Sequence, residues 1–138
     1  MKNNLLLIAS ALCLATSAMA QKINAAKLPI VIKQAFEKAY PMALKTIWDK
    51  EGKDFEASFK NGKESLSVVF DAKGTIIETE KTITAADLPA AVQAAMKGKK
   101  IKEAAEIIAH GKVYYEAEAG GKDYLFDAQG KTVKKLGE

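Results

Sequence analysis

The sequence contains no arginine, and cysteine and histidine each occur once in its 138 residues. Arginine is the side chain best suited to forked contacts with phosphate and with guanine, so its absence argues against a nucleic-acid-binding protein. The 21 basic residues are therefore all lysines, and they are interleaved with 17 acidic residues. Because the two signs alternate along the chain, we expect no continuous basic stripe for nucleic acid or for an anionic membrane.

The one cysteine, Cys13, lies in the apolar run that follows the N-terminus. Met1–Asn4 carries a single lysine, Leu5–Ala15 is almost wholly apolar, and Ala18-Met19-Ala20 offers small residues to a signal peptidase. This order is typical of a secretory signal peptide. A helix of about 11 residues is too short for a bilayer core of about 30 Å. We expect a signal peptide over residues 1–20, cleaved after Ala20; an uncleaved anchor is the alternative.

Export would leave a chain without cysteine, and so without disulfides or thiolate chemistry. Removing 20 of the 138 residues leaves 118, enough for one domain with its own core. No second apolar run is long enough to span a membrane. We therefore expect a single periplasmic or secreted domain over residues 21–138.

An internal repeat is the most informative positive feature of the sequence. Four landmarks recur in the same order about 60 residues later. They pair Leu28-Pro29 with Leu88-Pro89, Phe55-Glu56-Ala57 with Tyr115-Glu116-Ala117, Asn61-Gly62-Lys63 with Gly120-Gly121-Lys122, and Phe70-Asp71-Ala72-Lys73-Gly74 with Phe126-Asp127-Ala128-Gln129-Gly130. We expect two tandem copies, one over about 26–82 and one over about 83–136.

Each copy begins with an amphipathic helix followed by strands. Apolar residues recur at helical spacing over 28–39 and again over 88–96. Alternation with period two then predicts strands, about four in each copy, with tight turns at the Gly-containing landmarks. The predicted fold class is α+β: two tandem helix-plus-antiparallel-strand repeats form one sheet, both helices cover one face, and the other face is open to water or to a partner.

At these landmarks the chain resembles the PepSY-like, beta-lactamase-inhibitor-like exported proteins common in Bacteroidetes. The resemblance extends from about residue 26 to residue 133 and rests on turns and core positions. It implies the tandem helix-plus-sheet layout, and relatives that inhibit beta-lactamases or peptidases by docking a sheet face. No motif in this chain transfers such inhibition.

Few side chains offer catalytic chemistry. His110 is followed by Gly111 in an expected turn and has no companion at zinc-ligand spacing. The serines outside the signal peptide fall on strands and not in a nucleophile elbow. No phosphate-binding glycine loop is present. We therefore interpret the chain as non-enzymatic, with no cofactor and no metal.

Two pairs of carboxylates need a separate interpretation. Glu78 and Glu80 share one face of a strand, and so do Glu116 and Glu118. Such pairs suit acid–base work or calcium, but the lysines and threonines around the first pair favour a solvated sheet face. Asp71 and Asp127, which recur in both copies, are explained by turns.

Surface recognition remains, and four residues are candidates for it: Trp48, Val69, Tyr114 and Leu125. The last three lie out of phase with the core residues of their strands, so they form a candidate apolar patch on the open face. For Trp48, core packing at a strand end is the alternative.

We hypothesise an exported binding module that recognises a protein or peptide of the cell envelope through the open sheet face, with inhibition of a peptidase or hydrolase as one form of this. A periplasmic carrier of calcium or of a small ligand is the alternative hypothesis.

Overall fold

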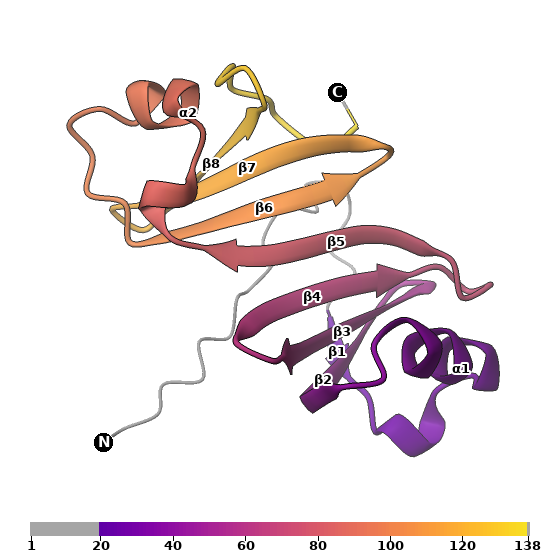
Figure 1. Cartoon of the computed structure of the whole chain (residues 1–138). Coiled ribbons are helices and arrows are strands. Elements are labelled where there is room, and N and C mark those ends of the chain that lie inside the picture. Colours follow the sequence, from indigo (N-terminus) through magenta and orange to yellow (C-terminus); the bar gives the residue numbers. More distant parts are fainter. Residues whose placement is uncertain (1–19, 138) are drawn as a thin grey trace.

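The computed structural model describes residues 20–137, which form one antiparallel sheet and two helices (Figure 1). The elements are β1 (Gln21–Lys22), α1 (Ile30–Ala39), β2 (Ala43–Glu51), β3 (Asp54–Asn61), β4 (Glu64–Phe70), β5 (Ile76–Ile83), α2 (Ala90–Ala95), β6 (Glu103–Ala109), β7 (Lys112–Ala119) and β8 (Lys122–Asp127). Every strand pairs with its neighbour in sequence. The predicted α+β fold is confirmed. The predicted signal peptide, with Cys13, lies outside the described residues except for Ala20.

The second copy contributes three strands to the sheet and not the expected four. After β8 the chain makes only an isolated bridge, between Phe126 and Thr132. The first copy has the four strands β2–β5 between its helix and α2. The difference follows from the C-terminal residues, which leave the sheet edge and cross one of its faces, as described below.

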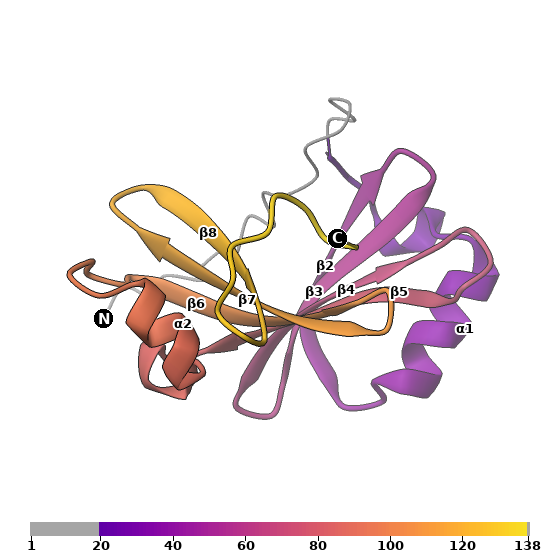
Figure 2. The same cartoon turned by 90° about the horizontal axis from the view of Figure 1, so that it is seen from above.

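Both helices cover the same face of the sheet, as predicted. Directly opposed residues of neighbouring strands point to one face, and one such row runs through Leu66, Lys81, Glu106, Tyr115 and Phe126. Leu66 belongs to the core beneath α1, and Phe126 belongs to the core beneath α2. The helices lie toward the two ends of the sheet (Figure 2).

The core beneath α1 is built on aromatic rings. Phe36 of α1 meets Trp48 and Phe59 with ring centroids 5.0 Å apart in both pairs, and Phe70 at 6.3 Å, in edge-to-face geometry. Such contacts contribute about 0.5–1.5 kcal/mol per pair beyond burial of the ring areas. Ile32, one turn earlier on α1, is fully buried in the same cluster.

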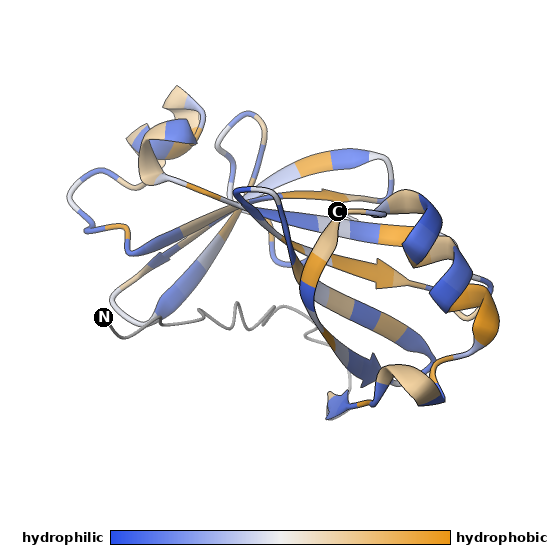
Figure 3. Cartoon of the chain, turned by 60° about the horizontal axis from the view of Figure 1, so that its bottom comes forward, coloured by the Kyte–Doolittle hydropathy of each residue, from blue (hydrophilic) through white to orange (hydrophobic). Residues whose placement is uncertain are grey.

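The core beneath α2 uses smaller side chains. Val92 and Met96 pack against Ala104, Ala117 and Phe126. The strands that carry both cores alternate hydrophobic and hydrophilic residues (Figure 3), which places one set of side chains under the helices and the other on the opposite face. The period of two seen in the sequence therefore assigned the faces correctly.

The repeated Asp-Ala-x-Gly landmark forms the same turn in both copies. Asp71 Oδ1 accepts hydrogen bonds from the backbone N–H groups of Lys73 and Thr75, each at 2.9 Å, and these bonds lower the pKa of Asp71. Asp127 Oδ1 accepts equivalent bonds from Gln129 and Lys131 at 2.9 Å. The turn interpretation of both aspartates is confirmed.

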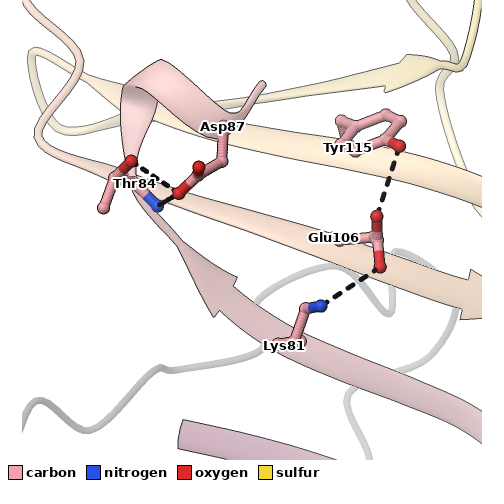
Figure 4. A network of polar contacts seen from close by, with 5 residues as sticks. All are labelled: Lys81, Thr84, Asp87, Glu106 and Tyr115. Atoms are coloured by element: carbon pink, nitrogen blue, oxygen red, sulfur yellow. Dashed lines mark hydrogen bonds and ion pairs between the residues drawn. The ribbon is translucent and has the colours of Figure 1, made fainter. Parts of the chain in front are cut away.

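Polar side chains of β5, β6 and β7, and of the segment before α2, form pairs with one another (Figure 4). Glu106 lies 3.8 Å from the Lys81 ammonium and accepts a hydrogen bond from the Tyr115 hydroxyl at 3.3 Å. Thr84 and Asp87 form a capping box at the short 3₁₀ helix Ala85–Asp87, which precedes α2. The helix-covered face thus neutralises the carboxylate that it carries at this position.

The turn glycine of the second copy predicts a measurable difference in stability. Gly130 has φ +78°, and a Cβ atom there would lie 2.7 Å from the carbonyl carbon and oxygen of Ala91 in α2. Gly62 has φ +61°, but a Cβ there meets nothing within 4 Å. Gly62→Ala should cost about 1 kcal/mol from the left-handed backbone alone, and Gly130→Ala about 1–3 kcal/mol more from overpacking. Urea unfolding of both variants measures this, and equal losses would contradict the close approach of the turn to α2.

Candidate functional site

The candidate site is the sheet face turned away from α1 and α2, here called the open face. No helix packs on it among the described residues. Its two halves differ in chemistry. Over β2–β5 most of its charged residues are carboxylates, while over β6–β8 it carries carboxylates together with the apolar residues Ile107, Ala109, Tyr114 and Leu125.

The apolar half is covered by the chain's own C-terminal segment, residues 131–137. Val133 and Leu136 pack against the cluster of Ile107, Ala109, Tyr114 and Leu125. The segment is fastened by hydrogen bonds from Val133 N–H to the Leu125 carbonyl and from Gly137 N–H to the Tyr114 hydroxyl, both 2.9 Å long. The expectation that the whole face is open is therefore wrong over β6–β8, because the apolar residues there are buried by this segment.

The four residues predicted for partner binding are not brought together. Trp48 lies on the helix-covered face, 6% exposed, because its register partner Ala57 belongs to the core beneath α1. Core packing is thus the correct interpretation of Trp48. Val69 is half-buried on the open face. Tyr114 and Leu125 lie on the same face but are 1% and 3% exposed beneath the C-terminal segment.

Four glutamates form the centre of the open face: Glu56, Glu78, Glu80 and Glu116, here called the carboxylate row. Glu80 on β5 lies directly opposite Ser67 on β4 and Ile107 on β6. Ser67 donates a short hydrogen bond to Glu56 on β3. Glu116 reaches the same region from β7, two strands beyond Glu80. The row therefore crosses from the first copy to the second.

Burial and the repulsion of neighbouring carboxylates raise the pKa values of Glu78, Glu80 and Glu116. Burial, followed by the negative charges of Glu116 and Glu78, raises the pKa of Glu80 to about 8. Burial, with the charge of Glu56 added, raises the pKa of Glu78 to about 7. Burial, with Asp123 and Glu78, raises the pKa of Glu116 to about 7. The glutamates are thus partly protonated near neutral pH.

The solvated interpretation of Glu78 and Glu80 is therefore wrong. Glu80 is only 3% exposed, and Glu78 is half-buried. The threonine and lysine neighbours that suggested a wet surface, Thr79 and Lys81, point to the helix-covered face because they alternate with the glutamates along β5.

Glu80 also has an unsatisfied oxygen. Within residues 20–137, neither Glu80 Oε1 nor Thr82 Oγ1 on the same strand face has a hydrogen-bond partner. A buried polar atom without a partner costs about 1–3 kcal/mol. The fold therefore holds an acceptor at the centre of the open face without supplying its donor.

No group of three or more histidine, cysteine, aspartate or glutamate side chains in the described part of the chain is placed to hold a metal ion. His110 occupies the predicted turn between β6 and β7 with φ +53°, and it is exposed and outside the row.

Sequence reasoning missed the carboxylate row and the covering segment. Both left signals. Glutamates at i, i+2 occur on β5 and on β7, and only the strand order brings Glu80 and Glu116 to one region. The tail after the last predicted strand is otherwise polar but contains two apolar residues, Val133 and Leu136.

Comparison with known sequences decides the family. The profile of the family described as "Putative beta-lactamase-inhibitor-like, PepSY-like" matches the chain twice, over residues 14–78 and over residues 53–134. The chain belongs to this PepSY-like family. The resemblance inferred from the repeated landmarks is confirmed. No functionally curated protein matches the chain.

Solved structures share the fold of this PepSY-like chain. A DUF2874 family protein from Bacteroides uniformis superposes with a TM-score of 0.69 at 19% identity, over 77% of this chain and 86% of that one. A protein from Bacteroides eggerthii described as "putative periplasmic" gives 0.69 at 18% identity, over 76% and 85%. A BLIP-like protein from Bacteroides fragilis gives 0.59 at 24% identity, over 77% and 84%. In residues 20–137 of the PepSY-like chain, no helix has the length and hydropathy needed to cross a membrane.

The raised pKa of Glu80 predicts how stability depends on pH. A carboxyl whose pKa rises on folding, here from 4.5 to about 8, binds more protons folded than unfolded. Its contribution is therefore full below about pH 4.5 and is lost as the pH rises toward about 8. The slope is at most about 1.4 kcal/mol per pH unit for one group. Thermal melting from pH 4.5 to 9 should show the PepSY-like protein losing stability with rising pH, and Glu80→Gln should flatten this loss.

The matched control for that series is Glu37→Gln, which changes the same charge on the exposed side of α1. It should leave the slope unchanged. Equal slopes for Glu80→Gln and the unaltered protein would contradict the raised pKa of Glu80.

The C-terminal segment predicts a second effect. Val133→Asp combined with Leu136→Asp should release the segment and expose Tyr114 and Leu125, since a buried carboxylate cannot remain in an apolar contact. Binding of a hydrophobic dye should rise several-fold, with far-UV circular dichroism unchanged. Lys134→Asp with Lys135→Asp, two exposed positions of the same segment, should give a smaller rise; an equal rise would contradict anchoring by the apolar pair.

Proposed function

We propose that this protein is an exported, non-enzymatic binding module that recognises a protein or peptide of the cell envelope through its open face. The observation that supports the proposal is a sheet face with polar and apolar side chains over β2–β5, beside an apolar cluster over β6–β8 that already holds a short chain segment. Sheet faces with exposed apolar and polar groups are a recurrent type of protein interface.

The part of the open face over β2–β5 offers groups suited to such contact. Ile47 on β2 and Val69 on β4 are half-buried apolar residues on the open face. The carboxylate row lies next to them. Apolar and charged side chains that lie next to one another can together form a protein-binding surface.

The BLIP-like relative supports inhibition of an envelope peptidase or hydrolase as the form that this recognition takes. The relative described as "putative periplasmic" supports a periplasmic location. Both details enter as parts of the proposal. The alternative of a calcium carrier receives no such support, because calcium sites take 6–8 oxygen ligands and the described residues offer no group of three carboxylates around one point.

Site-specific photo-cross-linking in intact cells tests the proposal. A photo-reactive amino acid replaces Ser58 or Val69 on the open face, or, as a control, Lys33 or Glu37 on the exposed side of α1. We expect discrete protein adducts from the open-face positions and none from the α1 positions. Cell-envelope adducts of the same kind and yield from both sets would contradict recognition by the open face.

A further inference from the structure

The open face concentrates negative charge in a chain that is basic overall. The sequence has a formal net charge of +4, yet the register places only three strand lysines on the open face, namely Lys22, Lys60 and Lys112. The strand carboxylates on that face are Asp49, Glu51, Asp54, Glu56, Glu78, Glu80, Glu103, Glu116, Glu118, Asp123 and Asp127. A partner that is complementary to this face is therefore cationic.

Two lysines near this face have partners other than Glu78, Glu80 and Glu116. Lys102 lies 3.6 Å from Glu118 and 3.9 Å from Glu103, at the outer end of the sheet. Lys60 donates to Ser65. Among the described residues, no lysine lies within ion-pair distance of Glu78, Glu80 or Glu116.

Glu80 is the independent sign that the centre takes a ligand. Its side chain is buried, and no donor in residues 20–137 satisfies Oε1, nor does one satisfy the neighbouring Thr82 Oγ1. On the other face, Glu106 at an adjacent position in the sheet has both Lys81 and Tyr115 as partners. The same fold can therefore supply partners to a strand glutamate, and it does not do so for this oxygen of Glu80.

The chain's own C-terminal segment indicates what kind of peptide this face accepts. Its sequence is Val133-Lys134-Lys135-Leu136, and its two apolar residues contact the open face over β6–β8. It is a short segment that bends at Lys134 and Lys135, with these two lysines between its apolar residues. Glu116 of the carboxylate row lies directly opposite Leu125 of this apolar cluster, and the other three glutamates lie on β3 and β5.

We propose that the carboxylate row is a subsite for a lysine or arginine side chain of the partner, carried on a segment that lies over β3–β5 with its cation at Glu80. The proposal rests on the proposed function and specifies the partner's chemistry. A side-chain ammonium or guanidinium supplies three to five N–H donors on a long apolar stem. It can therefore satisfy both Glu80 Oε1 and Thr82 Oγ1 and neutralise the glutamates around them.

A point-like metal ion fits the same groups less well. It needs three or more ligand atoms around one point, and the described carboxylates are not arranged in this way. A multidentate organic cation instead contacts acceptors that are spread along a row.

Binding of a cation to this subsite depends on pH. The groups that influence Glu80 are Glu56 on β3, Glu78 on β5, Glu116 on β7 and Asp123 on β8, and all of them raise its pKa; Ser67 and Ile107 are its uncharged neighbours on β4 and β6. A bound cation favours the ionised carboxylates. Affinity should therefore increase as the pH rises from 6 to 8.5, by up to about ten-fold per pH unit for each proton released.

The experiment uses the protein isolated from the cell envelope and a fluorescent nonapeptide of alternating lysine and valine. Two matched peptides carry acetyl-lysine or glutamate in place of lysine. At pH 8 and low salt, the lysine peptide should bind at least ten-fold more tightly than the acetylated one, and the glutamate peptide should not bind. Glu80→Gln should weaken binding of the lysine peptide about ten-fold, whereas Glu37→Gln on α1 should leave it unchanged.

The outcomes separate this proposal from the proposed function. Equal binding of the lysine and acetylated peptides, or equal binding by Glu80→Gln and the unaltered protein, would overturn the cation subsite, while open-face cross-links would still support recognition by that face. Selective lysine binding without any cross-linked partner would support the subsite and contradict the envelope partner. If Glu80→Gln fails to fold, the half-buried Glu116→Gln replaces it, with the same expected loss of lysine selectivity.

Discussion

The pairing of β5 with β6 is the contact on which the rest of the structure depends. Within residues 20–137 it is the only strand pairing that joins the two copies of the repeat, because the sheet runs from β1 to β8 in sequence order. The register of this pair, Glu80 with Ile107 and Lys81 with Glu106, fixes which side chains of each copy share a face. A shift by one residue would exchange the faces of one copy relative to the other.

Three consequences follow from that register. Both helices cover one face, and the apolar stripe of each helix packs on the strands of its own copy. The glutamates of β5 fall on the opposite face, beside the apolar residues of β6 and β7. Glu80 and Glu116 come from different copies, and the charge of Glu116 adds to the effect of burial in raising the pKa of Glu80. The unusual electrostatics of the open face is thus a property of the junction and belongs to neither copy alone.

The two copies use one plan with unequal cores. The first copy packs aromatic rings beneath a ten-residue helix, whereas the second packs alanines beneath a six-residue helix. The second copy gains a further apolar cluster on the open face, where the C-terminal segment covers Tyr114 and Leu125. Burial on both faces compensates for a smaller helix interface, since hydrophobic stabilisation scales with the apolar area removed from water. The covering segment therefore stabilises the second copy and covers the apolar cluster on its part of the open face.

Local patterns in the sequence determined much of this protein. Period-two alternation located the strands, the Leu-Pro landmarks located the helices, and the Asp-Ala-x-Gly landmark located the turns, because each depends on contacts within a few residues. The tertiary structure alone decided the placement of Trp48 in the core, the burial of Tyr114 and Leu125, and the carboxylate row. Those features depend on which strands become neighbours and on where a short tail docks. Contacts between residues far apart in sequence determine how much solvent reaches a side chain. For this reason glutamates that the sequence pattern placed on a solvated surface are buried in the folded protein.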